Sequence, residues 1–168
     1  KRASIEPIPL HTKKTILQRC IQLLKRHRDN MFGDDDCKPI SIIISTLAAR
    51  AYRGEQNIEE ALFNIIKYMP TYINASSPRV PNPVNPNEDF TDRWIDPKQK
   101  HLNLEKNFFN WLMQAEIDFK NILSNKINPE EKSTILKEKF SLSMGDQSFS
   151  NHAKVKNILC YYAMIILK

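Results

Sequence analysis

The chain has 168 residues, and its 25 Lys and Arg against 19 Asp and Glu give a formal net charge of +6 at pH 7. A chain of this length suits a single domain that buries roughly two thirds of its unfolded surface, so it needs no disulfide or metal to fold. With 41% apolar residues, the composition excludes wholesale disorder, collagen and coiled-coil repeats, and the modest positive charge permits anionic partners without requiring a nucleic-acid groove.

Neither a membrane span nor a signal peptide is visible in the sequence. No apolar run approaches the roughly 20 residues that cross a membrane, and the start, Lys1-Arg2-Ala3-Ser4, lacks both an apolar core and an initiator Met. We therefore expect a cytoplasmic protein without a membrane partner, present as a fragment or processed chain. The cysteines Cys20, Cys37 and Cys160 are widely spaced without a C-x-x-C motif, which is typical of a reducing compartment.

The first two predicted elements are helices. Glycine is scarce and long stretches have a period of 3.6 residues, which predicts an all-α domain. A helix is predicted over residues 15–31, where one apolar stripe holds Ile16, Cys20, Leu23, Leu24, His27 and Met31. Gly33 follows as its stop. A second helix is predicted over residues 40–52. Its isoleucine run has strand character, but Pro39 at the first position and Gly54 beyond the end favour a buried central helix.

The later elements complete a bundle of about five to six helices. One helix is predicted from the Asn57 cap to the residue before Pro70, and others over residues 102–124, 128–140 and 150–167. Between them, residues 70–101 form a long stretch that holds six of the ten prolines. Its apolar anchors indicate a loop ordered against the core. These anchors are Val80, Val84, Phe90 and Trp94.

A row of basic side chains borders the apolar stripe of the first helix. At 100° per residue, Ile21, Lys25 and Arg28 line one edge of that stripe. Such a row suits an anion site, because the stems pack on apolar surface while the charged heads reach a shared cleft. A solvated basic face is the alternative, and the spacing leaves both open.

Two hydroxyl side chains lie one turn apart at the start of the second predicted helix. Ser41 and Ser45 could donate hydrogen bonds to a phosphate, which would also benefit from the positive end of the helix dipole. Alternatively, small residues there merely allow helices to pack closely.

Other polar clusters favour local structural roles. Asp34, Asp35 and Asp36 could hold Mg²⁺, but they follow a helix in a loop, which favours a solvated turn. Asn82 and Asn85 in the proline-rich stretch either cap local backbone or hydrogen-bond a nucleobase. The histidines lack metal-ligand spacing, and no Walker A loop, Gly-x-Ser-x-Gly motif or Rossmann fingerprint is present. The residues alone therefore indicate no catalytic set and no metal site.

Three motifs in order carry a resemblance to a known family. They are the run from Lys14 to Asp29, the run from Lys38 to Tyr52, and the pair Asn82-Pro83-Val84-Asn85-Pro86 and Phe90-Thr91-Asp92-Arg93-Trp94. Together they resemble the bacterial cGAS/DncV-like nucleotidyltransferases (CD-NTases), the signal synthases of antiphage CBASS systems. The similarity covers residues 14–94 well and the later helices loosely.

The resemblance implies a part of a larger enzyme. In that family a mixed-sheet lobe carries a Gly-Ser motif and the acids that hold two Mg²⁺, and a helical lobe like that of the PAP/OAS-like nucleotidyltransferases completes the nucleotide cleft. This chain is similar to the helical lobe only, so residues 1–168 are expected to form one helical domain without catalytic residues, inactive by itself. The intact, Mg²⁺-dependent enzyme would join ATP or other nucleoside triphosphates into cyclic di- or trinucleotides. Its partners would be the catalytic lobe, the nucleotides and a regulatory protein from the same operon.

The family's nucleotide contacts carry over to two positions. Lys25 and Ser41 correspond to residues that contact the triphosphate, and Arg28 and Asn85 are weaker candidates for the cleft. Ile42 stands where some relatives stack an aromatic ring on a base, a contact that isoleucine does not provide. The alternative is a nucleic-acid-binding or protein-interaction module without catalysis, which predicts that Lys25 and Ser41 lie on unrelated surfaces.

Overall fold

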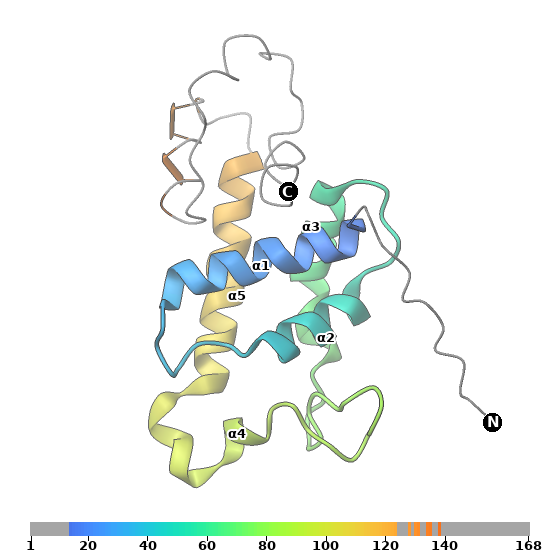
Figure 1. Cartoon of the computed structure of the whole chain (residues 1–168), viewed down its shortest axis with the longest axis vertical. Coiled ribbons are helices and arrows are strands. Elements are labelled where there is room, and N and C mark those ends of the chain that lie inside the picture. The colour runs from blue at the N-terminus through green and yellow to red at the C-terminus, as the bar shows by residue number, and fades with distance from the viewer. Residues whose placement is uncertain (1–13, 124–127, 129, 132–133, 136–137, 139–168) are drawn as a thin grey trace, which may run out of the picture.

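The structure, a computed structural model, describes residues 14–123 together with 128, 130, 131, 134, 135 and 138 (Figure 1). The elements of residues 14–123 are α1 (Ile16–Phe32), α2 (Ser41–Ala51), α3 (Ile58–Tyr68), the 3₁₀ helix η1 (Met69–Tyr72), α4 (Asp92–Ile95), the 3₁₀ helix η2 (Pro97–Leu102) and α5 (Leu104–Leu123). This part of the chain contains no strand, only an isolated bridge between Pro81 and Asp89. The prediction of an all-α fold is confirmed.

The two C-terminal helices of the prediction lie largely or wholly outside the described residues. Asn128 Oδ1 accepts a hydrogen bond of 2.8 Å from the Glu131 amide, and residues 130, 131, 134, 135 and 138 are helical, which agrees with the predicted cap. The predicted end near residue 140 and the predicted helix over residues 150–167 lie outside them.

Helix α1 is closed by local signals at both ends. Thr15 and Gln18 form a capping box, in which each side chain accepts a hydrogen bond from the other residue's amide. At the other end the Gly33 amide donates to the Asp29 carbonyl over 2.8 Å, with a positive φ of 57° that suits glycine. The middle of the predicted stripe is buried and Ile16 is partly buried, whereas Met31 is 45% exposed. The stripe therefore ends before Met31, which was wrongly included in it.

Helix α2 begins later than predicted and is open on one side. Ile40 is the extended N-cap residue, so Pro39 precedes the helix instead of occupying its first position. Ser41, Ile42 and Ala49 are exposed, and the other side of the helix is buried. The expectation of a helix buried all round was wrong, because α2 packs on its neighbours with one side only and leaves even Ile42 45% exposed.

The core lies where α1, α2 and α3 pack on one another and on α5. Figure 1 shows α1 crossing α5, with α2 beside α1. The largest fully buried side chains come from all four helices and η1, and are Trp111, Phe108, Phe119, Leu24, Ile43, Ile44, Leu47, Leu62, Ile65 and Met69. A buried polar contact of 3.0 Å between His27 Nε2 and Asp118 Oδ2 also joins α1 to α5. None of the described helices has the combined length and apolar character of a membrane span.

The proline-rich stretch is ordered but less irregular than predicted, since it contains η1, α4 and η2. Val80 is fully buried, and Phe90 and Trp94 pack against the core as expected. Val84 is 91% exposed, so its prediction as an anchor was wrong. Val84 lies in a local turn, where its amide donates a hydrogen bond of 2.9 Å to the side-chain oxygen of Asn82, two residues earlier.

One carboxylate holds this loop together. Asp89 accepts hydrogen bonds from the amides of Arg79, Val80 and Thr91 and from the hydroxyls of Ser77 and Thr91. Burial by itself would raise the pKa of Asp89, but the hydrogen bonds from Thr91 and the backbone amides hold that pKa well below its usual range. The ionised carboxylate therefore fixes both ends of the turn that carries Asn85.

Candidate functional site

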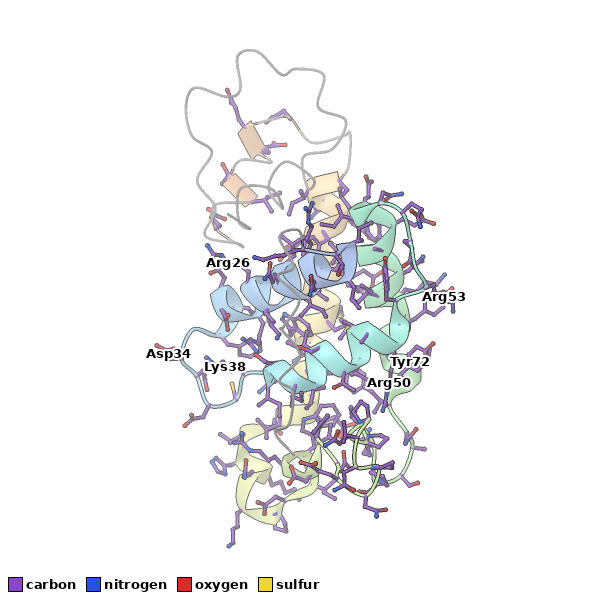
Figure 2. The ribbon with its side chains drawn as sticks, turned by 45° about the vertical axis from the view of Figure 1, so that its right-hand side comes forward. Arg26, Asp34, Lys38, Arg50, Arg53 and Tyr72 are labelled. Carbon is purple, nitrogen blue, oxygen red and sulfur yellow. The ribbon has the colours of Figure 1, made fainter. Side chains whose placement is uncertain are left out.

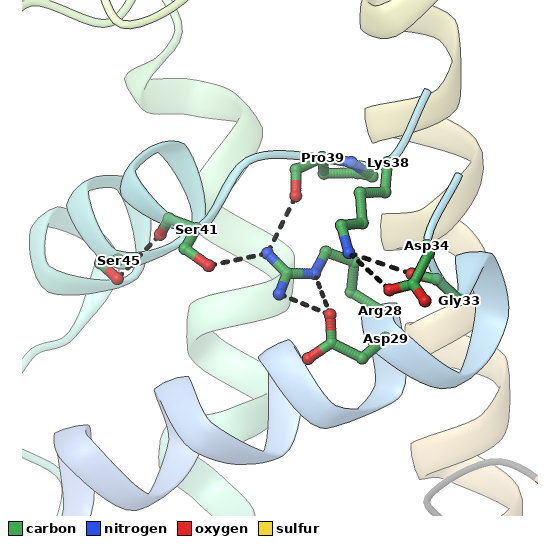
Figure 3. Close-up of polar contacts among 8 residues, drawn as sticks. All are labelled: Arg28, Asp29, Gly33, Asp34, Lys38, Pro39, Ser41 and Ser45. Atoms are coloured by element: carbon green, nitrogen blue, oxygen red, sulfur yellow. Dashed lines mark hydrogen bonds and ion pairs between the residues drawn. The ribbon is translucent and has the colours of Figure 1, made fainter. Parts of the chain in front are cut away.

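The side chain of Arg28 joins the end of α1 to the start of α2. Its Nη1 donates to the Pro39 carbonyl over 3.0 Å and to Ser41 Oγ over 2.8 Å (Figure 3). The residue is only 6% exposed. The sequence placed Arg28 on the edge of the apolar stripe with its head in a cleft, whereas the structure buries it against the neighbouring helix.

Most donors of this guanidinium are already engaged. Nε and Nη2 donate to Asp29 Oδ1 over 3.0 and 2.6 Å, so Arg28 makes four hydrogen bonds with its five N–H groups. The Asp29 carboxylate also balances the buried charge. Arg28 is therefore suited to hold the α1–α2 junction and poorly suited to bind a ligand directly.

The first residue of α2 presents an oriented hydroxyl to solvent. Ser41 is exposed, and its Oγ accepts from Arg28. Because that oxygen is occupied as an acceptor, its own O–H points to a different partner and is available to an external acceptor such as a phosphate oxygen. Ser45 differs, since its Oγ already donates to the Ser41 carbonyl over 2.9 Å. The small hydroxyl row predicted from the sequence thus contains one available donor.

The backbone at this point adds to the same polarity. No side-chain hydrogen bond caps the N-terminus of α2, so its first-turn amides have no partner within the helix. Together with the helix dipole, these N–H groups attract an anion. The Ser41 hydroxyl and the first-turn amides of α2 therefore both favour an anionic ligand.

Lys25 lies one helical turn before Arg28 and is partly buried. Burial lowers the pKa of Lys25, the Arg28 charge lowers it further, and Asp29 partly offsets both effects. The described residues offer the ammonium no hydrogen bond or ion pair. Arg28 thus contacts Ser41 and acts electrostatically on Lys25, and we refer to Lys25, Arg28 and Ser41 together as the junction.

Asn85, the remaining residue predicted to line the cleft, is not part of this junction. Asn85 is exposed in the proline-rich loop, where its carbonyl accepts a hydrogen bond of 2.9 Å from the Glu88 amide. The loop is tied to the opposite end of α2, since Arg50 Nη2 donates to the Pro81 carbonyl over 2.7 Å (Arg50 is labelled in Figure 2). Among the described residues, no contact joins Asn85 to Lys25, Arg28 or Ser41.

The acidic turn between α1 and α2 makes local contacts. Asp34 is exposed and lies 3.9 Å from Lys38 Nζ, which also donates to the Gly33 carbonyl (Figures 2 and 3). Asp35 accepts from the Cys37 amide over 2.9 Å, which lowers the pKa of Asp35. These contacts are those of a solvated turn. No group of three or more His, Cys, Asp or Glu suited to a metal ion occurs in the described part of the chain.

Comparisons with known proteins relate the chain to two named synthases. No family model matches the chain. A protein named c-di-GMP synthase from Roseivirga ehrenbergii is 33% identical over 135 residues, which cover 77% of this chain and 35% of that protein. A protein named cyclic dinucleotide synthase CdnG from Bradyrhizobium diazoefficiens is 32% identical over 101 residues, which cover 55% of this chain and 24% of that protein. The chain is CD-NTase-like. It spans about a third or less of these CD-NTase relatives, so most of each relative has no counterpart in it.

Proposed function

We propose that this chain is the helical nucleotide-binding lobe of a cyclic oligonucleotide synthase. The intact enzyme would join nucleoside triphosphates into cyclic di- or trinucleotide messengers for antiphage defence in the cytoplasm, under the control of a protein partner. The observation that carries the proposal is the hydrogen bond of 2.8 Å between Arg28 and Ser41, because it links the lysine-bearing helix to the hydroxyl-bearing helix. The similarity to cyclic dinucleotide synthases supports nucleoside triphosphates as the ligand of that junction.

In this proposal, Lys25 and Ser41 bind the triphosphate in different ways. Lys25 acts as a point charge, which suits a flexible polyphosphate tail, and Ser41 donates its hydroxyl hydrogen. The first-turn amides of α2 add further donors. Arg28, whose charge is paired with Asp29, positions Ser41.

The chemistry itself would depend on a catalytic lobe that this chain does not contain. Acidic residues of that lobe would hold Mg²⁺, which neutralises the phosphates during in-line transfer. A 3′- or 2′-hydroxyl attacks the α-phosphate, the bond to the β-phosphate breaks, and pyrophosphate leaves. Lys25 and Ser41 would hold the triphosphate in line with the attacking hydroxyl, which is catalysis by positioning.

The geometry favours this proposal over a binding module without catalysis. A nucleic-acid or protein-interaction module predicts unrelated surfaces for Lys25 and Ser41. Instead, Arg28 donates to Ser41 and its charge also acts on Lys25. A shared anion site would account for a lysine without an ion pair one turn from the arginine that holds the Ser41 hydroxyl.

The coding sequence upstream of Lys1 provides the first test. A Gly-Ser followed by an Asp-x-Asp on a predicted strand is expected there. The protein that includes this sequence should convert labelled ATP and GTP to a cyclic product with Mg²⁺, and the chain of residues 1–168 should not. Turnover by this chain alone, or an upstream sequence without the acids, would contradict the proposal.

A substitution in the intact protein tests the site itself. Lys25→Ala should weaken triphosphate binding by roughly one to two powers of ten. This factor corresponds to the loss of a charged hydrogen bond, which contributes about 1.5–3 kcal/mol. Lys120→Ala is the matched control, because Lys120 is exposed on α5 and pairs with Glu116. Unchanged affinity in calorimetry would remove Lys25 from the site.

A further inference from the structure

A separate hollow of about 480 Å³ lies on the surface where α4, η2 and the start of α5 meet. Its volume falls within the range of roughly 300–1,000 Å³ that is usual for small-ligand sites. Neither α1 nor α2 contributes to its lining. The residues that matter for its chemistry are Trp94, Lys100, Leu104, Lys106, Phe109 and Asn110.

The apolar part of the hollow includes two aromatic side chains. Phe109 is 37% exposed, although its neighbours on α5, Phe108 and Trp111, are fully buried. Phe108 meets the Phe109 ring edge to face, with ring centroids 5.5 Å apart. Trp94 is partly buried and has the Arg79 guanidinium 5.4 Å from its ring centroid. The exposed ring of Phe109 therefore offers a surface on which a planar ligand can stack.

The polar rim has cationic and amide groups with no partner in the described structure. Lys100, Lys106 and Asn110 are exposed, and their side chains make no hydrogen bond or ion pair with the described residues; the Lys100 carbonyl accepts only a backbone hydrogen bond from Asn103. The acid on the rim, Glu105, is neutralised by Arg79 at 2.7 Å. The rim therefore carries net positive charge and an amide that can both donate and accept.

We propose that this hollow binds a nucleotide, with the base stacked on Phe109 and the phosphate between Lys100 and Lys106. The Asn110 amide would hydrogen-bond the edge of the base, as asparagine does with adenine. An aromatic face, an amide and two unpaired cations together match the base and phosphate of a nucleotide. The site shares no residue with the junction of Lys25, Arg28 and Ser41, so it is independent of the proposed function. The bound nucleotide can be a free molecule or one unit of a single-stranded nucleic acid.

Tryptophan fluorescence of the full chain tests this proposal. The chain has two tryptophans, and Trp111 is fully buried, so quenching by a surface ligand reports on Trp94. Titration with AMP and with a short single-stranded oligoadenylate should give saturable quenching. Tighter binding of the oligoadenylate, with a steeper loss in salt, identifies a strand as the source, and equal binding identifies the free nucleotide.

Matched variants locate the binding. The double variant Lys100→Gln and Lys106→Gln should weaken binding roughly tenfold or more. Phe109→Leu, whose folding is checked by circular dichroism, should also weaken it. The control variant Lys98→Gln and Lys120→Gln removes equal charge outside the lining of the hollow and should leave binding unchanged. Absence of saturable quenching up to about 5 mM of both probes, or equal weakening in the control variant, would overturn the proposal.

Discussion

Replacing Arg28 by lysine keeps the charge but removes the geometry of the α1–α2 junction. The guanidinium reaches Pro39, Ser41 and Asp29 at once, whereas a lysine ammonium cannot span all three. Losing one or two buried charged hydrogen bonds should cost about 2–4 kcal/mol of the free energy of unfolding. At about 3 °C per kcal/mol, the melting temperature should fall by roughly 6–12 °C.

The same variant should change triphosphate affinity only through Ser41 and the start of α2. Ser41→Ala removes a donor to a charged phosphate and should weaken binding about 10- to 150-fold. Arg28→Lys leaves the hydroxyl in place but misorients it, so about 2- to 12-fold is expected. When Ser41 is already alanine, Arg28→Lys has no hydroxyl left to misorient. The double-mutant cycle should therefore give a coupling energy of about 1 kcal/mol.

Calorimetry of the intact protein with a non-hydrolysable triphosphate measures all four corners of this cycle. Arg50→Lys is the matched control, because Arg50 lies at the other end of α2 and makes one hydrogen bond to the Pro81 carbonyl. That substitution should leave triphosphate affinity unchanged. Strictly additive effects of Arg28→Lys and Ser41→Ala would refute the argument that Arg28 acts through Ser41.

Three further predictions concern the loop, the lysine and the end of α1. Hydrogen bonds hold the pKa of Asp89 below its usual range. Its stabilisation is therefore complete above the unfolded pKa of about 3.9 and is lost as pH falls through the lower folded pKa. Asp89→Asn should then destabilise the protein in urea at neutral pH, and the difference should shrink in acid; a constant difference would contradict this. The pKa of Lys25 is lowered mainly by burial and should rise when an anion binds. Triphosphate affinity should therefore be full below the lowered pKa of the free protein and fall as pH rises through it, a dependence that calorimetry should not find in Lys25→Gln. Gly33 has a φ of 57° with open space around its Cβ position, so Gly33→Ala should cost about 1 kcal/mol through the backbone alone, measurable as a lower melting temperature.

The sequence predicted helices α1, α3 and α5 well because each has a clear apolar stripe. It placed the start of α2 too early, since Pro39 resembles a first helical residue, yet Ile40 stays extended as the N-cap. Val84 was misassigned because hydrophobicity alone does not show that a residue lies at the tip of a turn. Local signals thus predicted the elements, and the errors occurred where the path of the chain between elements decides burial.

The role of Arg28 could not be predicted in the same way. One of its partners, Asp29, is the next residue in the sequence. Another, Ser41, is 13 positions away. That second contact exists only because α1 and α2 pack side by side. Stripe geometry placed Arg28 at the border of the buried face, but the packing of α2 covers this border. Arg28 therefore positions Ser41 instead of binding a ligand itself.

The burial of Arg28 is itself an argument for a role beyond stability. A buried charge carries a desolvation cost, and well-packed apolar residues often serve stability as well or better. A methionine at this position could fill the space, but it would leave the Pro39 carbonyl and the Ser41 hydroxyl without their donor. The guanidinium instead fixes the Ser41 oxygen as an acceptor, which leaves the Ser41 hydroxyl hydrogen for another partner. One turn earlier on α1, burial and then the Arg28 charge lower the pKa of Lys25, a cost that a bound anion would relieve.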